Sequence, residues 1–256
     1  MFAKYFHTTA FFLFTVIGLN AMAQETNEQL WEKANALYNS EEYSQAVSAY
    51  EQILSSGEES AKLYFNLGNA YYKTGDINHA ILNYERAKLL APQDEDIDFN
   101  LRMANQFVVT SIEALPKPFF LRWKQSVVNT YPTDTWAFMS ISAFILFLVL
   151  LGLYIFGRSV KIKKISFLTG IAAIVFSAFT FSFAAEQKEE INNRNQAVVF
   201  CPRVTVKSSP SQSGTDLFLI YEGLKVEITD NLDKWAEIKL ADGNKGWLPD
   251  SCIVKI

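Results

Sequence analysis

Two long stretches of the chain contain no charged residue. They run from Ala137 to Gly157 and from Ile165 to Ala185, and each is 21 residues long. As an α-helix, a stretch of this length spans roughly 30 Å, the thickness of the hydrocarbon core of a bilayer. A pair of buried helices in a soluble protein is the alternative, but such helices rarely stay apolar on all sides over this length. The pattern therefore predicts membrane-spanning helices at residues 136–157 and 165–185.

The connection at residues 158–164 carries four basic side chains and no acidic one. Short basic loops remain on the cytoplasmic side of a membrane, because positive charge is poorly translocated. Lys117, Arg122 and Lys124 precede the first span and favour the opposite orientation, but they are more widely spaced. We therefore expect a hairpin with a cytoplasmic turn and with both flanking segments on the outer side.

The amino-terminal residues 1–23 have the pattern of a signal peptide. Lys4 precedes an apolar run from Phe11 to Gly18, and Ala21-Met22-Ala23 supplies the small residues of a cleavage site. We expect cleavage before Gln24, and an uncleaved signal anchor is the alternative. In both cases the segment that follows is exported, in agreement with the expected orientation of the hairpin.

A period of 34 residues follows this segment. A shift of that length superimposes six pairs of identical residues, which are Asn35 on Asn69, Ala36 on Ala70, Tyr38 on Tyr72, Ala46 on Ala80, Tyr50 on Tyr84 and Glu51 on Glu85. This period is typical of tetratricopeptide repeats, in which each repeat is a pair of helices. We expect repeats at 27–60 and 61–94 and a capping helix at 95–108.

The second repeat is the more complete of the two. Gly68 and Ala80 let its helices approach closely, Tyr84 fills the space between them, and Pro92 ends the second helix. A third repeat begins, since Phe99-Asn100-Leu101 follows Phe65-Asn66-Leu67 by one period, but its second helix is missing from the pattern.

Tetratricopeptide repeats bind partner peptides or helices on the concave face that their inner helices form. The positions expected on this face are Trp31, Asn35, Tyr38, Asn39, Phe65, Asn69, Tyr72 and Lys73. Packing within the core is the alternative for the aromatic residues, whereas it explains the two asparagines less easily.

An acidic carboxyl-terminal tail is not the expected ligand. The repeats that clamp such a tail need basic residues on the first and third inner helices, where this chain has Trp31, Asp96 and Asn100. Residues 24–96 also contain 13 acidic and five basic side chains, so they repel an acidic ligand.

From Gln196 onward the pattern changes to short runs of alternating polarity. The runs are Val204–Lys207, Leu217–Tyr221, Leu224–Thr229, Trp235–Leu240 and Gly246–Leu248, and Asp242-Gly243-Asn244 forms a hairpin turn. Short strands of this kind predict a small all-β barrel at residues 196–256. The Val204–Pro210 segment, Gly223-Leu224-Lys225-Val226, Trp235 and Gly246-Trp247-Leu248 resemble the bacterial SH3-like domain.

The SH3-like resemblance implies binding of cell-wall peptides or of proteins. Trp235 and Trp247 are the candidate binding residues, and a place in the core is the alternative for both. The terminal strands of such barrels commonly lie side by side, which brings Cys201 near Cys252. Since the compartment is oxidising and the chain has only these two cysteines, we expect a disulfide between them; two buried free thiols are the alternative.

Two polar connections join these parts. Residues 109–135 include a run of aromatic and basic residues from Leu115 to Lys124, which favours an amphipathic segment in the plane of the membrane interface, with a plain linker as the alternative. Residues 186–195 are a polar linker that can continue the second span for a few turns.

The composition offers little material for catalysis. The chain has two histidines, His7 and His79, and two cysteines, so structural zinc sites and triads with a histidine are not expected. An envelope hydrolase would need a nucleophile with a histidine partner, and the exported segments supply only His79. The net charge of −4 is not that of a nucleic-acid binder. We expect no metal, no cofactor and no enzymatic activity.

The order of these parts resembles the BatE family of the Bacteroides aerotolerance operon, and the resemblance includes Asp98–Arg102 and Val206–Pro210. It implies a protein of the bacterial inner membrane with both soluble modules in the periplasm. It also implies partners among Bat-type membrane proteins with von Willebrand type A domains and, indirectly, a MoxR-type ATPase. We expect a non-enzymatic scaffold with a tetratricopeptide solenoid, a two-helix hairpin and an SH3-like barrel. A peptidoglycan sensor acting through the SH3-like module is the alternative.

Overall fold

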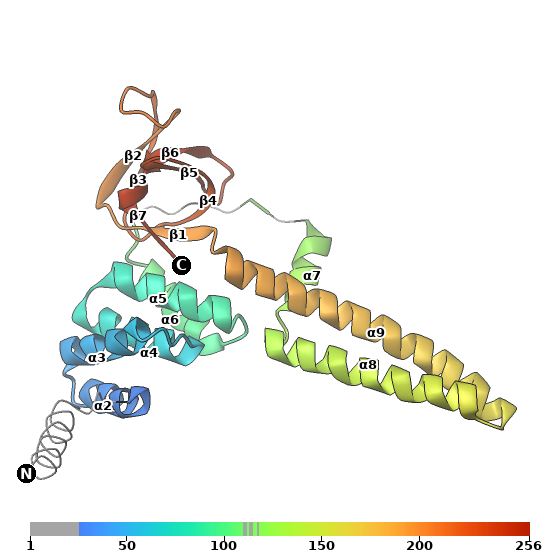
Figure 1. Ribbon diagram of the computed structural model, residues 1–256. Helices are drawn as coiled ribbons and strands as arrows, with labels where there is room; N and C mark the ends of the chain where they lie inside the picture. The colour runs from blue at the N-terminus through green and yellow to red at the C-terminus, as the bar shows by residue number, and fades with distance from the viewer. Residues whose placement is uncertain (1–25, 110–111, 113–114, 117) are drawn as a thin grey trace, which may run out of the picture. The chain divides into compact units, whose positions relative to one another are not determined.

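A computed structural model describes residues 26–109, 112, 115–116 and 118–256 (Figure 1). The expected signal peptide at residues 1–23 lies outside this range. The chain divides into two compact units, with the boundary between Glu58 and Glu59. The second repeat belongs to the same unit as the residues that follow it.

The first unit contains the helices of the first repeat, α2 (Asn27–Asn39) and α3 (Tyr43–Ser55). Thr26 and Gln29 form a capping box, which satisfies backbone N–H groups at the start of α2. The ring of Tyr50 is buried, and its hydroxyl donates a hydrogen bond to Oδ1 of Asn35 over 2.7 Å. This bond ties the two helices together.

The second unit begins with three helices, α4 (Ala61–Thr74), α5 (Ile77–Leu90) and α6 (Glu95–Asn105). Side chains of Ser60, Asp76 and Asp94 cap their amino-terminal ends. A Cβ on Gly68 would lie 2.8 Å from the ring of Tyr84, so only glycine lets α4 and α5 pack this closely. The expected packing of the second repeat is present.

A short helix and a long helical hairpin follow. They are α7 (Phe119–Val128), α8 (Thr133–Phe156) and α9 (Val160–Asn193). The turn of the hairpin is shorter than the basic connection in the sequence, because Lys161, Lys163 and Lys164 already belong to the start of α9. Beyond the apolar run, α9 continues through the expected polar linker as far as Asn193.

Small residues line the contact between α8 and α9. On α9 the buried residues alternate at spacings of three and four positions, namely Ser166, Gly170, Ala173, Ser177, Thr180, Ala184 and Gln187. This heptad-like spacing keeps one narrow face toward α8. Near the middle, Ser140 Oγ donates to the carbonyl of Ser177 over 3.0 Å, and Ser177 Oγ donates to the carbonyl of Ser140 over 2.9 Å.

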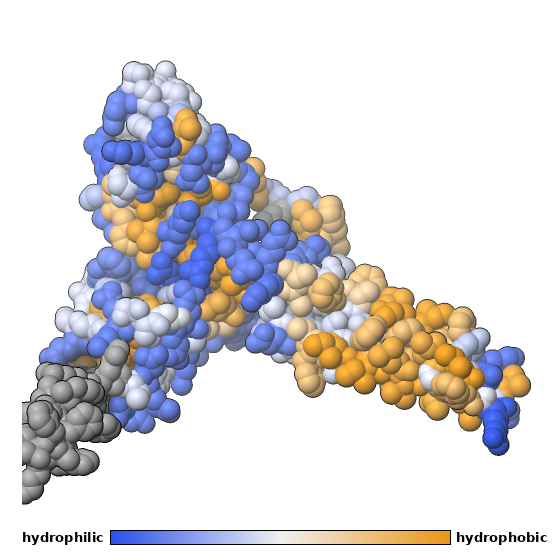
Figure 2. Space-filling model, in the orientation of Figure 1, coloured by the Kyte–Doolittle hydropathy of each residue, from blue (hydrophilic) through white to orange (hydrophobic). Residues whose placement is uncertain are grey.

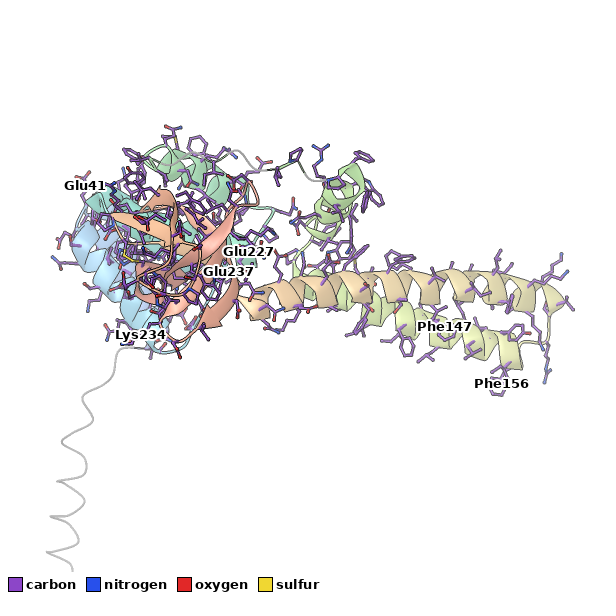
Figure 3. All side chains as sticks on the ribbon, turned by 90° about the horizontal axis from the view of Figure 1, so that it is seen from above. Glu41, Phe147, Phe156, Glu227, Lys234 and Glu237 are labelled. Atoms are coloured by element: carbon purple, nitrogen blue, oxygen red, sulfur yellow. A yellow bond between two sulfur atoms is a disulfide. The ribbon has the colours of Figure 1, made fainter. Side chains whose placement is uncertain are left out.

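The remainder of the hairpin is exposed and apolar. On the face that Figure 2 shows, apolar residues cover most of the hairpin, whereas polar residues predominate on the rest of the described surface. Phe156, at the far end of α8, is 84% exposed and projects away from the hairpin (Figure 3). Only 11% of the most apolar part of α8 and 28% of that of α9 are buried, so the pair does not form the core of a soluble domain. Both helices are long and apolar enough to cross a membrane.

The carboxyl-terminal residues form one seven-stranded antiparallel sheet. Its strands are β1 (Gln196–Val199), β2 (Arg203–Lys207), β3 (Asp216–Tyr221), β4 (Lys225–Leu232), β5 (Trp235–Lys239), β6 (Lys245–Pro249) and β7 (Ile253–Lys255). Their order is β3-β2-β6-β5-β4-β1-β7. The five expected runs correspond to β2 through β6, and Asp242-Gly243-Asn244 turns between β5 and β6.

The two cysteines lie beside the two neighbouring strands at one edge of the sheet. Cys201 follows β1 and Cys252 precedes β7, and these strands pair with each other. A disulfide joins the two residues, whose Cα atoms are 4.9 Å apart. It therefore links the first strand of the sheet to the last.

The second repeat and the sheet share a hydrophobic core. Ala80 and Ile81 of α5 and Leu101 and Ala104 of α6 pack with Val198 of β1 and with Ile256. The second helix of a third repeat would cover the same surface of α5 and α6. The sheet therefore closes the end of the repeat in place of the helix that the sequence lacks.

Candidate functional site

The expected binding residues of the second repeat lie on and beside α4. Phe65 and Tyr72 are half-buried and pack against the shared core, whereas Lys73 is exposed. Oδ1 of Asn69 accepts two hydrogen bonds, one from the hydroxyl of Tyr84 over 2.8 Å and one from Nδ2 of Asn100 over 2.7 Å. Asn69 therefore has a structural partner that the sequence argument did not consider.

The same arrangement recurs in the first unit. Asn35 accepts from Tyr50 as Asn69 accepts from Tyr84, one period later. Trp31 lies against Tyr50 with ring centroids 5.8 Å apart, and Asn39 is exposed. Tyr38 is half-buried beside Tyr43, and burial, followed by the charge of Tyr43, raises the pKa of its hydroxyl. The repeated asparagines thus hold helix pairs together through a tyrosine.

An apolar stripe on α6 and the turn after it is not among the binding residues expected from the sequence. Phe99, Met103 and Phe107 are 57%, 37% and 60% exposed. They follow Phe65, Asn69 and Lys73 by one 34-residue period, so Phe99 and Met103 occupy binding positions of the third inner helix and Phe107 lies just after its end. The shift that identifies the first two repeats could have found them.

Trp235 and Trp247 lie on the outer face of the sheet. In β5 and β6 the fully buried residues are Ala236, Ile238 and Leu248, and the tryptophans alternate with them. Both are half-buried, and Trp247 pairs in register with Glu237, two residues from Trp235. Neither belongs to the hydrophobic core of the sheet.

His79 lies at the contact between the second repeat and the sheet. Its ring stacks on Tyr71 with centroids 4.8 Å apart and meets the edge of Phe200 at 4.9 Å. Nδ1 is 2.8 Å from Oδ2 of Asp76. These contacts give the only histidine of the described residues a structural role, and no hydroxyl or thiol nucleophile is bonded to it there.

One ion pair and two hydrogen bonds surround the same contact. Nζ of Lys225, at the start of β4, is 2.6 Å from Oε2 of Glu85 on α5, whose side chain is only 8% exposed. Nδ2 of Asn78 donates to Glu222 over 2.7 Å, and Nη2 of Arg86 donates to the carbonyl of Lys255 over 2.7 Å. The sheet is thus bound to α5 by polar contacts around an apolar centre.

A second charged cluster joins the end of α9 to the start of α4. Burial acts to raise the pKa of the Glu59 carboxyl, but hydrogen bonds from Arg194 and Tyr64 outweigh it and hold this pKa below its ordinary value. Burial lowers the pKa of Arg86, whose guanidinium lies 5.6 Å from the ring centre of Tyr64. The carboxyl-terminal end of α9 is therefore tied to the repeat by charge.

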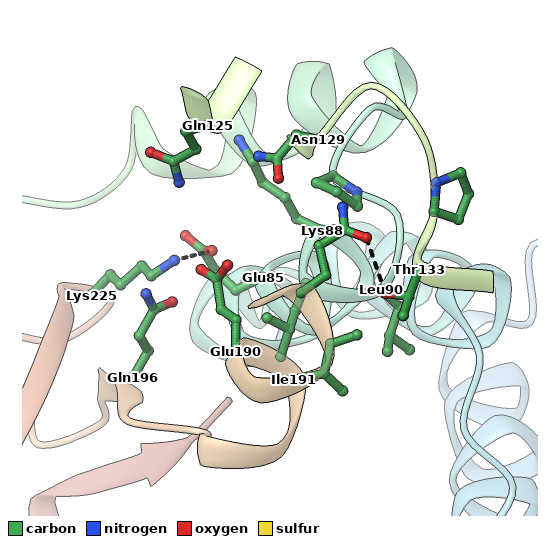
Figure 4. A pocket seen from close by; sticks show the side chains of 14 residues that line it. Glu85, Lys88, Leu90, Gln125, Asn129, Thr133, Glu190, Ile191, Gln196 and Lys225 are labelled. Atoms are coloured by element: carbon green, nitrogen blue, oxygen red, sulfur yellow. Dashed lines mark hydrogen bonds and ion pairs between the residues drawn. The ribbon is translucent and has the colours of Figure 1, made fainter. Parts of the chain in front are cut away.

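A cleft of about 250 Å³ lies beside these contacts (Figure 4). Residues of α5, α7, α9 and the sheet line it, and its walls are mainly amides and charged groups, including Gln125, Asn129, Gln187 and Glu190. Oγ1 of Thr133 donates to Oε1 of Gln187 over 3.1 Å. The lining contains no histidine or cysteine, and the described residues contain no cluster of three potential metal ligands.

The comparisons with known proteins concern the helical repeats. No curated protein sequence matches the chain. Among solved structures, the tetratricopeptide domain of Sgt2 from Aspergillus fumigatus is 17% identical, with 65% of this chain and 82% of that chain covered and a TM-score of 0.30. The type III secretion chaperone SycD from Yersinia enterocolitica is 15% identical, with 66% and 99% covered and a TM-score of 0.31.

A second structure of SycD, in complex with a peptide of the translocator YopD, also has 15% identity and a TM-score of 0.31, with 66% of this chain and 100% of that chain covered. Scores this low support no particular function. Residues 61–94 match the tetratricopeptide repeat family. The helices α4 and α5 span this range and pack as that repeat requires, so the chain contains a tetratricopeptide repeat, which is a protein-interaction module.

Proposed function

We propose that this protein is a non-enzymatic scaffold of the bacterial inner membrane. In this proposal α8 and α9 cross the bilayer as a hairpin, and the repeats and the sheet stand together on its outer side. The observation that carries the proposal is the shared core of α5, α6 and β1, because it makes the repeat and the sheet one body. A body of this kind, fixed to a membrane, suits the assembly of other proteins.

The order of the elements along the chain supports a position of the repeats and the sheet on the same side of the membrane. The repeats precede α8 and the sheet follows α9, so an antiparallel pair of spans leaves both at one end. At that end Lys124 of α7 pairs with Glu186 of α9 over 2.7 Å, and Arg194 pairs with Glu59. The basic residues Arg158, Lys161, Lys163 and Lys164 are at the opposite end, which favours a cytoplasmic turn and a periplasmic body.

The partners that we propose are membrane proteins of the Bat type with von Willebrand type A domains, with a MoxR-type ATPase as an indirect partner. The resemblance to the BatE family supports this choice. The acidic excess of the repeats supports partners with basic or apolar binding segments over partners with acidic tails.

A peptidoglycan sensor is the second candidate, and the position of the tryptophans supports it. Trp235 and Trp247 lie on the outer face of the sheet, where aromatic rings can contact a ligand. In this reading the sheet is an SH3-like domain that binds the cell wall, and the repeats are secondary.

Affinity purification after crosslinking in native membranes tests the scaffold proposal and the peptidoglycan-sensor proposal. A scaffold should retain specific membrane proteins, and the variant Asn39→Arg with Lys73→Glu, two exposed positions of the expected concave face, should lose them. The double variant Trp235→Ser with Trp247→Ser is the matched control and should keep them. Retention of peptidoglycan fragments that only the tryptophan variant loses would instead support the sensor.

A further inference from the structure

We infer that α6 completes a peptide-binding surface for an extended, apolar segment that carries a lysine or arginine near one end. The inference rests on the proposed scaffold function and names the chemistry of its partner. It starts from Phe99, Met103 and Phe107, three large apolar side chains that stay exposed in a polar helical unit.

Part of the stripe shares one side of the helix. Phe99 and Met103 are four positions apart on α6, and Asp96 and Asn100 fall on the same face by the helical period. Phe107 lies in the turn that follows the end of α6 at Asn105. Its helical part, from Phe99 to Met103, is about 6 Å long at 1.5 Å per residue. The ring of Tyr72 on α4 extends it sideways, since its centroid is 6.1 Å from that of Phe107.

Unused amide groups lie beside this stripe. Asn69 and Asn100 bond to each other, and this leaves Nδ2 of Asn69 and Oδ1 of Asn100 without a hydrogen-bond partner among the described residues. One group donates and the other accepts, so together they match the N–H and C=O of a peptide backbone. A helix has satisfied its own backbone groups, whereas an extended segment has not. The site therefore favours an extended segment.

The charges at the two ends of the stripe differ. Glu95 and Asp96, in the first turn of α6, are exposed and have no ion-pair partner among the described residues, whereas Asp98 is paired with Lys88. At the other end, Lys73 follows Tyr72 and is exposed. A bound segment is therefore favoured when its basic residue lies beside Glu95 and Asp96 and its neutral or acidic end lies beside Lys73.

A degenerate dodecapeptide library tests this specificity, with acetylated and amidated ends so that terminal charges do not contribute. The full chain, held in lipid nanodiscs, is incubated with the library, and the bound peptides are sequenced. We expect enrichment of apolar residues and of lysine or arginine. Enrichment of acidic residues, or no enrichment, would overturn the inference.

Two sets of variants locate the binding. Met103→Ser with Phe107→Ser should weaken binding of an enriched peptide about tenfold or more, as expected when apolar anchors of a binding site are lost. Leu232→Ser, which removes a side chain 51% exposed on β4, should leave the affinity unchanged. Glu95→Gln with Asp96→Asn should keep the apolar preference and lose the basic one. If the first double variant binds as the wild type does, the stripe is not the site.

Photocrosslinking in native membranes distinguishes a polypeptide from lipid. With p-benzoylphenylalanine in place of Met103, we expect adducts to a polypeptide segment of apolar and basic composition. Adducts to lipid alone would overturn the inference. If the library fails but membrane proteins still co-purify with the full chain, only this site is wrong; if both fail, the scaffold proposal fails as well.

Discussion

Single residues at the contact between α5 and the sheet carry charges that burial makes costly. Glu85 is the clearest case, because its side chain is 8% exposed and its carboxylate is neutralised by Lys225. When one partner of a buried ion pair is removed, the other is left as an uncompensated charge in a medium that solvates it poorly.

Lys225→Met should therefore destabilise the second unit, by roughly 1 to 3 kcal/mol since Lys225 itself is partly exposed. Thermal unfolding of the full chain in detergent measures the loss. Lys239→Met is the control, because the Lys239–Glu227 pair is 40% and 51% exposed and such pairs are worth about 0 to 1 kcal/mol. Equal losses in both variants would contradict the role of burial.

Gly223 has a different constraint. Its φ is +79°, and a Cβ there would lie 2.9 Å from Cγ2 of Val108, in the contact between the sheet and the helices. Gly223→Ala should therefore add a steric cost of roughly 1 to 3 kcal/mol to the backbone strain. Hydrogen exchange of the α5 amides should become faster.

Gly75→Ala separates the two costs. Gly75 has a φ of +85°, but a Cβ there would meet no atom within 4 Å, so this variant has the backbone strain alone. If both alanine variants expose α5 to exchange equally, the close contact at Gly223 contributes nothing.

Among the elements, the hairpin of α8 and α9 depends most on the close packing of small residues between its two helices. Ser177 lies in the small-residue seam and exchanges hydrogen bonds with Ser140. Ser177→Leu should force α8 and α9 apart and lower the thermal midpoint of the full chain in detergent, at a cost of roughly 1 to 3 kcal/mol. Ser182→Leu, on the exposed side of α9, should have no comparable effect. An unchanged midpoint in Ser177→Leu would show that the seam is not tightly packed.

The sequence predicts the elements well where one pattern dominates. Gly68, Tyr84 and Pro92 identify the second repeat, and a comparison of families bears this out. The five alternating runs correspond to strands β2 to β6. The 3.6-residue and two-residue periods are local properties, so a single sequence contains them.

The sequence does not predict how the second repeat and the sheet meet. Val198 and Ile256 are apolar, so the sequence alone would place them in the core of the sheet. In the structure both pack with α5 and α6. Glu85 and Lys225 are 140 residues apart in sequence, and no local pattern relates them. The structural role of Asn69 is not predictable from the sequence for the same reason, since its hydrogen-bond partners come from α5 and α6.

The whole molecule is, in this account, a periplasmic body on a membrane hairpin. Two properties follow together from that arrangement. The basic start of α9 must lie on the side opposite to both the repeats and the sheet, and the repeats and the sheet must share a side. An arrangement with only one of these properties would not bring both modules to the same partners.

Thiol labelling in intact cells tests this claim most directly. The two native cysteines are bonded to each other, so an introduced cysteine is the only reactive thiol of the described residues. Ser44→Cys on α3 and Lys234→Cys should react with a membrane-impermeant maleimide from outside; Lys234 lies in the turn between β4 and β5 and is labelled in Figure 3. Ser159→Cys in the hairpin turn should react only after lysis. Labelling of Ser159→Cys in intact cells, or of only one of the other two, would contradict the account.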